Sequence, residues 1–120
     1  MGNLSTPSPA LIARILKEVD FENRFIGGSL HLRAGVRVVS LYRLEEVFML
    51  LNKPHPQIDL SKLHVWISTV IQDEELAHGV KQVIAGDGSE RHKMLAARDM
   101  IGMRILQCRQ YAHGPEKSAV

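Results

Sequence analysis

Cysteine is almost absent from this chain, with Cys108 the single example among 120 residues. One thiol excludes an internal disulfide, so the fold has to be held by its core. The first ten residues, MGNLSTPSPA, also lack the basic and apolar regions of a secretion signal. Both observations predict a protein of the reducing cytoplasm.

Aromatic residues are scarce as well, with three Phe, two Tyr and one Trp. Because 45% of the residues are hydrophobic, the core must rest on Leu, Ile, Val, Met and Ala, which favours helices over a β-sandwich. No apolar run approaches the roughly 18 residues that a membrane span requires. The sequence therefore predicts no contact with the membrane interior.

An excess of one charge is also missing, since the net charge is +2 and the pI is about 8.9. This small surplus does not by itself indicate nucleic-acid binding, which is typical of strongly basic domains. The length of 120 residues and the 23% of charged residues are those of one ordinary globular domain.

The first third of the chain predicts a helix and a hairpin. Residues 1–8 are rich in Ser and Pro and are expected to be a flexible lead, after which Ser8-Pro9 is typical of a helix start. Gly27-Gly28 is expected to break the chain. Apolar and polar residues then alternate on both sides of Ala34-Gly35, which predicts a small β-hairpin near residues 29–39 with that pair as its turn.

Apolar residues at helical spacing fill the remainder. The helix starts are expected to be capped by Ser40, Asp59 or Ser61, Asp73 and Ser89. Gly114-Pro115 is expected to end the last helix, which leaves a flexible tail over 114–120. The predicted fold class is mainly α (α+β), with about five helices and the hairpin in one compact domain over 9–113.

The segment Glu75-Leu-Ala-His78 places a carboxylate and an imidazole on one helical face. Carboxylate-bridged di-metal bundles use two such pairs, and the sequence has no second one. A carboxylate in the first turn of a helix is also stabilised by about 0.3–1 kcal/mol without any metal. Glu75 and His78 are therefore the minority metal candidates, and no cofactor is predicted.

Complete catalytic motifs are missing from the sequence. There is no Gly-x-Ser-x-Gly elbow, no phosphate-binding loop and no dinucleotide fingerprint. Cys108 falls on the apolar stripe of the last helix, which predicts a buried, inert thiol. The six histidines are scattered, so only a metal site assembled from distant residues stays open. The sequence predicts a protein that is not an enzyme.

Basic side chains gather around the hairpin and along the last helix. Such stripes can track phosphates or face a protein partner. Met100 and Met103 fall off the main apolar stripe of the last helix and would give it a second apolar side. The candidate surface for a partner or a nucleic acid comprises Arg33, Arg37, Arg43, Arg98, Met100, Met103, Arg104 and Arg109.

The segments SLYRLEEVF (40–48) and LHVWISTVIQDEELAHGV (63–80) resemble an uncharacterised prokaryotic domain family. In that family a hairpin precedes a Ser-Leu-x-x-Leu helix, a Trp-Ile segment and an Asp-Glu-Glu-Leu-Ala helix start. The resemblance covers residues 25–108 and is carried by Ser40, Leu41, Leu44, Trp66, Ile67, Asp73, Glu74, Leu76 and Ala77. IDLSKLH stands where the family has a His-rich loop and Asn-Asp-Phe. The family has no assigned activity, so the resemblance implies an architecture alone.

Two functions remain as hypotheses. The first is a small non-enzymatic accessory or adaptor protein that acts through protein–protein contacts, as a homo-oligomer or as a subunit of a larger complex. The alternative is a nucleic-acid-associated protein that uses the Arg-rich hairpin and the basic last helix.

Overall fold

The computed structural model of the chain describes residues 4–31, 33 and 35–118. The elements are α1 (Pro9–Leu16), the 3-10 turn η1 (Phe21–Asn23), β1 (Phe25–His31), β2 (Gly35–Leu41), α2 (Leu44–Leu51), β3 (Pro56–Gln57), α3 (Leu60–Trp66), the π-helical turn η2 (Ile67–Ile71), α4 (Glu74–Ala85) and α5 (Glu90–Ser118). These five α-helices and the small antiparallel sheet confirm the predicted fold class.

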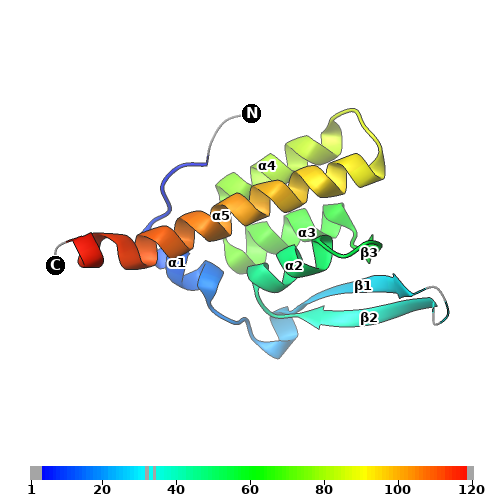
Figure 1. Cartoon of the computed structure of the whole chain (residues 1–120), viewed down its shortest axis with the longest axis horizontal. Helices are drawn as coiled ribbons and strands as arrows, with labels where there is room; N and C mark the ends of the chain where they lie inside the picture. The colour runs from blue at the N-terminus through cyan, green and yellow to red at the C-terminus, as the bar shows by residue number, and fades with distance from the viewer. Residues whose placement is uncertain (1–3, 32, 34, 119–120) are drawn as a thin grey trace.

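Helix α5 runs through the whole molecule and contacts α1, α2 and α4, while the sheet lies beside α2 and α3 (Figure 1). The core between them is aliphatic and includes Leu44, Leu63, Ile67, Leu76 and Ile101, all fully buried. Burial of such side chains contributes about 1.5–3 kcal/mol each, so this shared core holds the helices together.

Local signals place most helix starts where the sequence predicts them. Ser8 accepts a hydrogen bond from the amide of Leu11, and Asp59 accepts from the amides of Ser61 and Lys62. Two further predicted caps also hold, since Asp73 caps α4 and Ser89 caps α5. A cap depends on the few residues that follow it, which explains why the sequence suffices here.

The prediction that Ser40 starts a helix is wrong. Ser40 and Leu41 belong to β2, where Leu41 pairs with Phe25, and α2 begins only at Leu44. The buried side chains of Phe25 and Leu41 join the core, so sheet pairing keeps the chain extended beyond the local helix signal.

The hairpin spans 25–41 and is longer than predicted. Gly27-Gly28 does not break the chain but lies inside β1. A Cβ atom at Gly27 would stand 2.9 Å from Cδ2 of Leu50, so glycine at this position allows the strand to pack closely against α2. The prediction that Gly35 lies in the turn is also wrong. Gly35 belongs to β2 and pairs with His31, and Leu32 and Ala34 lie outside the described residues.

Two further features were not predicted. α3 continues as a π-helical turn that ends in left-handed Gln72 (φ 62°), and Arg14 donates to the carbonyl oxygens of Ile71 and Gln72 at 3.0 and 3.3 Å. α5 continues to Ser118, past the Gly114-Pro115 pair expected to end it. A proline removes one backbone donor, which a helix can pass at an energetic cost.

Candidate interaction surface

Strand β2 lies at the edge of the sheet. The strand order is β2-β1-β3, so within the described part of the chain β2 pairs with β1 on one side and with no strand on the other (Figure 1). An unpaired edge presents backbone N–H and C=O groups to any strand that reaches it. The residues of β2 whose backbone N–H and C=O groups face outward are therefore the ones that can pair with an incoming strand.

Two hydrogen bonds fix the direction of these groups. The amide of Leu30 donates to the carbonyl of His55 beside β3, so the backbone N–H and C=O groups of the even-numbered residues of β1 face away from β2. In the antiparallel pairing, the backbone groups of the odd-numbered residues of β2 therefore face β1, and those of the even-numbered residues face outward. A second hydrogen bond supports this assignment: the carbonyl of Tyr42, an even-numbered residue, accepts from the amide of Val19 at 2.7 Å on the outer side.

The outer edge is closed at one end and open along the strand. At Tyr42 the carbonyl is held by Val19, and the amide donates to Glu46 at 2.6 Å. Val36, Val38 and Ser40 also point their backbone outward. Within the described part of the chain, no backbone group outside the sheet pairs with these three.

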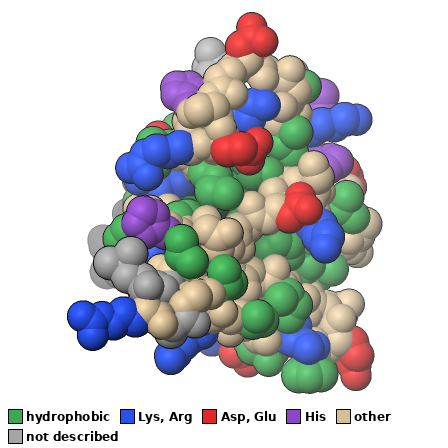
Figure 2. Space-filling view, turned by 90° about the vertical axis from the view of Figure 1, so that its right-hand side faces the viewer, with side chains coloured by type: hydrophobic (Ala, Val, Ile, Leu, Met, Phe, Trp, Pro, Cys, Tyr) green, Lys and Arg blue, Asp and Glu red, His purple; other side chains and the backbone are tan. Residues whose placement is uncertain are grey.

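The same residues carry an apolar face. Residues that pair directly share a face, so Val36 and Val38 stand with Leu30 and Ile26 on the side opposite the core. Val38 is 70% exposed and Val36 55%. Figure 2, which looks at the hairpin end of the molecule, shows hydrophobic side chains at the surface of its lower half with Lys and Arg nearby. We call Ile26, Leu30, Val36 and Val38 the outer sheet face.

The other side of β2 borders a groove of about 570 Å³ between the strand and α2. Its wall is apolar at Val39, Met49 and Leu50, and basic at Arg37 and Lys53. The described edge of β2 is thus apolar on one side, and on the other it borders a groove that combines apolar side chains with two cationic ones.

The predicted basic surface does not form one stripe. Arg33, Arg37 and Arg43 are exposed at the hairpin end and just after it, as expected. On α5, however, Arg109 pairs with Glu45 of α2, and both residues line, with Met103, a groove between α2 and α5. Met103 and Arg109 therefore line a different groove from Arg37, although Met49 borders both.

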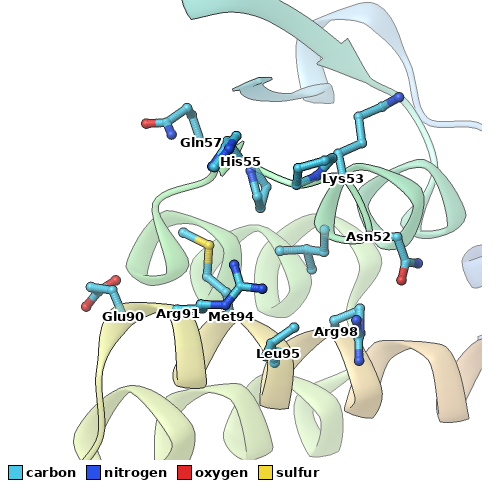
Figure 3. A pocket seen from close by; sticks show the side chains of 12 residues that line it. Asn52, Lys53, His55, Gln57, Glu90, Arg91, Met94, Leu95 and Arg98 are labelled. Atoms are coloured by element: carbon cyan, nitrogen blue, oxygen red, sulfur yellow. The ribbon is translucent and has the colours of Figure 1, made fainter. Parts of the chain in front are cut away.

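Arg98 lies at a third place. Together with Arg91 and Met94 it faces the 52–57 loop that carries His55, around a cleft of about 340 Å³ (Figure 3). Arg98 also donates to the carboxylate of Asp99 at 2.8 Å. Arg91 is exposed, whereas Arg98 is half-buried and already paired with Asp99.

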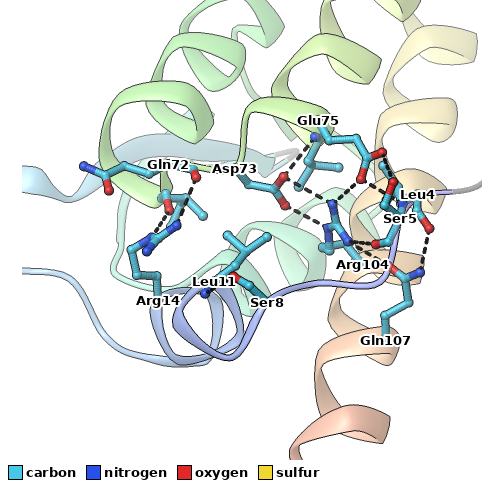
Figure 4. A network of polar contacts seen from close by, with 12 residues as sticks. Leu4, Ser5, Ser8, Leu11, Arg14, Gln72, Asp73, Glu75, Arg104 and Gln107 are labelled. Atoms are coloured by element: carbon cyan, nitrogen blue, oxygen red, sulfur yellow. Dashed lines mark hydrogen bonds and ion pairs between the residues drawn. The ribbon is translucent and has the colours of Figure 1, made fainter.

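Arg104, predicted as part of the basic surface, is instead buried, with 1% of its surface exposed. Its Nε and Nη2 atoms donate to the carboxylate of Asp73 at 2.8 and 3.3 Å, and Nη2 also donates to Glu75 at 2.8 Å (Figure 4). The carboxylates compensate the desolvated guanidinium, which would otherwise be strongly unfavourable in the core.

The N-terminal segment completes this cluster. Arg104 Nη1 donates to the carbonyl of Ser5 at 2.7 Å, and Gln107 donates to the carbonyl of Leu4 at 2.9 Å. The amide and hydroxyl of Ser5 donate to Glu75 at 2.8 and 2.7 Å. Residues 4–5, expected to belong to a flexible lead, are thus bound to α4 and α5. We call Ser5, Asp73, Glu75, Arg104 and Gln107 the Arg104 cluster.

The hydrogen bonds with Ser5, followed in importance by those with Arg104, hold the pKa of Glu75 below its ordinary value of 4.5. The carboxylate is therefore occupied by protein donors. His78 is exposed one turn further along α4. Among the residues that the structure describes, no three His, Cys, Asp or Glu side chains are grouped to hold a metal ion.

Met100 also differs from its prediction. It is buried, and its sulfur fills the space beside Gly79 of α4, where a Cβ atom would approach it to 2.5 Å. Helical spacing could have indicated both: Met100 and Arg104 lie three residues after Ala97 and Ile101, apolar residues of the last helix that are fully buried.

Cys108 is buried as predicted, and desolvation raises the pKa of its thiol to about 11. A thiol in this state is a poor nucleophile, so it supplies no reactive centre. None of the helices within the described ranges is both long and apolar enough to span a bilayer.

Comparison with known proteins adds no assignment. No family model, no curated protein sequence and no solved structure matches this chain. The resemblance of residues 25–108 to an uncharacterised family therefore stays an expectation, and the geometry of the chain itself carries the functional argument.

Proposed function

We propose that this protein is a small non-enzymatic accessory subunit that acts by binding another protein through the outer edge of β2. The observation that carries this proposal is the coincidence of an open backbone edge with exposed valines at Val36 and Val38. We expect this role to be exercised in the cytoplasm.

Edge strands of monomeric proteins are usually short, charged, bulged or covered, because an open apolar edge invites pairing. β2 has seven residues, and Arg37 is its single charged residue. The adjacent outer sheet face adds exposed apolar area, which in contiguous form is typical of interaction sites. An open edge of this kind supports binding to a partner.

The test is site-specific photo-crosslinking in cells that naturally express the protein. A photoreactive amino acid is placed at Val38, and the control carries it at Lys81, which is exposed on α4. We expect an adduct at position 38 alone, whose partner is identified by mass spectrometry and then binds the purified protein. Equal labelling at both positions, or none, contradicts the proposal.

Nucleic-acid binding is the second candidate, and one observation favours it. Residues 23–44 contain four arginines and no Asp or Glu. The surface is nevertheless smaller than the sequence indicated, because Arg104 is buried and Arg109 is paired. This candidate predicts oligonucleotide binding that weakens steeply with salt and falls in Arg33→Gln, Arg37→Gln double variants. No binding at low salt excludes it.

A further inference from the structure

We propose that the partner contributes an extended segment in which apolar and acidic residues alternate, and that this segment adds to the sheet as a fourth strand beside β2. The inference rests on the proposed function and specifies the chemistry of the partner. Strand addition of this kind combines main-chain hydrogen bonds, which hold the segment, with alternating side-chain contacts, which select it.

The main-chain requirement follows from the open stretch of edge. Val36, Val38 and Ser40 each turn an N–H and a C=O outward, whereas Tyr42 is closed by Val19 and Glu46. An incoming strand therefore pairs along residues 36–40 and ends before Tyr42. A proline among the paired residues would remove a donor, so the segment lacks proline there.

The side chains of an added strand alternate between the two sides of the sheet. On one side they lie next to Val36 and Val38, whose side chains are largely exposed in the free protein. Apolar side chains at these alternate positions bury that surface and gain the hydrophobic contribution.

On the other side, the intervening side chains enter the groove between β2 and α2. Arg37 and Lys53 line it, and the one acidic residue of the groove, Glu46, accepts from the Tyr42 amide. Arg33 and Arg43 flank the strand, and no acidic residue occurs between 23 and 44. Carboxylates at the intervening positions complement this charge, whereas Lys or Arg would be repelled.

The same charge argues against a second copy as the occupant. A twofold axis would pair β2 with β2 of the other copy and place the Arg33, Arg37 and Arg43 set of each beside the other. Like charges facing each other across an interface oppose association. An acidic partner strand removes this repulsion.

Calorimetry with a capped seven-residue peptide of alternating valine and glutamate tests the inference on the full chain. We expect saturable binding, weakened about tenfold or more when lysine replaces glutamate. A peptide of the same composition with its valines and glutamates in separate blocks is expected to bind no better than the lysine peptide. Equal binding of all three peptides contradicts the alternation.

Backbone pairing is tested by N-methylation. Only every second amide of an added strand faces β2, so methylating the valine amides or the glutamate amides must abolish binding in one case and spare it in the other. Equal affinity of the two methylated peptides overturns strand addition. The protein itself is unchanged in this comparison.

Val38→Pro is the matching protein variant. The amide of Val38 faces outward, so proline removes no bond to β1, as Pro56 already shows at the opposite edge. We expect an unchanged thermal midpoint and loss of peptide binding. A dimer that dissociates in Val38→Pro, or binding of oligothymidine without binding of the peptide, overturns the inference in favour of those occupants.

The two proposals fail separately. A specific crosslink at position 38 together with no binding of the alternating peptide overturns the acidic segment and leaves the protein-binding function standing. Absence of the crosslink overturns the function itself.

Discussion

Arg104 and Arg37 carry the same guanidinium group in two different environments, one buried and paired with carboxylates and the other exposed and without an ion pair in the described part of the chain. Arg104 is buried, and Asp73, Glu75, Ser5 and Gln107 meet its donors. Arg37 is exposed at an edge where, within the described residues, no acidic side chain forms an ion pair with it. The first arrangement is complete within the chain, whereas the second is solvated and, under the proposed function, open to a partner. This contrast separates a structural polar cluster from a candidate binding surface.

The largest effect is expected when the Arg104 cluster loses its buried carboxylate. Asp73→Ala leaves the guanidinium desolvated without its main partner and also removes the cap of α4, so we expect a loss of about 3–5 kcal/mol in the free energy of unfolding. Urea denaturation measures it. Asp99→Ala, which breaks an exposed pair with Arg98, is the control and should change it by less than about 1 kcal/mol. Similar losses in both variants contradict the distinction.

A smaller effect is expected from crowding of the contact between α5 and α2. A Cβ atom at Gly102 of α5 would stand 2.6 Å from the Phe48 ring, so Gly102→Ala should destabilise by about 1–3 kcal/mol although alanine favours helix. At Gly86 the nearest atoms are 3.5 Å away, and Gly86→Ala is expected to be near neutral. The thermal unfolding midpoints of the two variants, each compared with wild type, measure this difference. A Gly102→Ala protein as stable as wild type would falsify this packing.

Acid should weaken the cluster through Glu75. Its pKa is lowered in the folded state, so the carboxylate contributes stability that is present above pH 4.5 and is lost as the pH falls through the folded pKa. Because the side chain is 42% exposed, we expect less than about 1 kcal/mol. Urea midpoints of wild type and Glu75→Gln should differ at pH 7 and converge toward pH 3. A constant difference across this range contradicts the assignment.

The smallest effect is expected on the outer sheet face. Val38→Ala should change the free energy of unfolding by less than about 0.5 kcal/mol, because the side chain is already solvated. Leu44→Ala, in the core, should lose about 2–5 kcal/mol. Chemical denaturation of the two variants makes the comparison. A large loss at Val38 would indicate that this residue serves the fold rather than a partner.

Much of the fold could be predicted because its signals are local. The caps at Ser8, Asp59, Asp73 and Ser89 and the apolar spacing of the helices depend on neighbours a few residues away. The start of α2 could not be predicted in this way. Leu41 pairs with Phe25, sixteen positions earlier, and that pairing prevails over the helix signal at Ser40.

The candidate site was predictable only in part. The exposure of the hairpin arginines could be predicted because a charged residue is solvated by default and its exposure does not depend on distant residues. Helical spacing indicates the buried side of α5 for Arg104, but its partner Asp73 lies 31 residues away, so the sequence does not show the ion pair. The open edge of β2 depends on strand order and on the direction of each backbone group, which no local pattern encodes.

Amide hydrogen exchange on the free protein and with the alternating peptide tests the central claim most directly. In the free protein, the amides of Val36, Val38 and Ser40 should exchange rapidly while those of Arg37, Val39 and Leu41, which bond to β1, are protected. The peptide should slow exchange at the first three alone. Protection of those three without peptide, or no change when it is bound, would contradict an open edge that receives a partner strand.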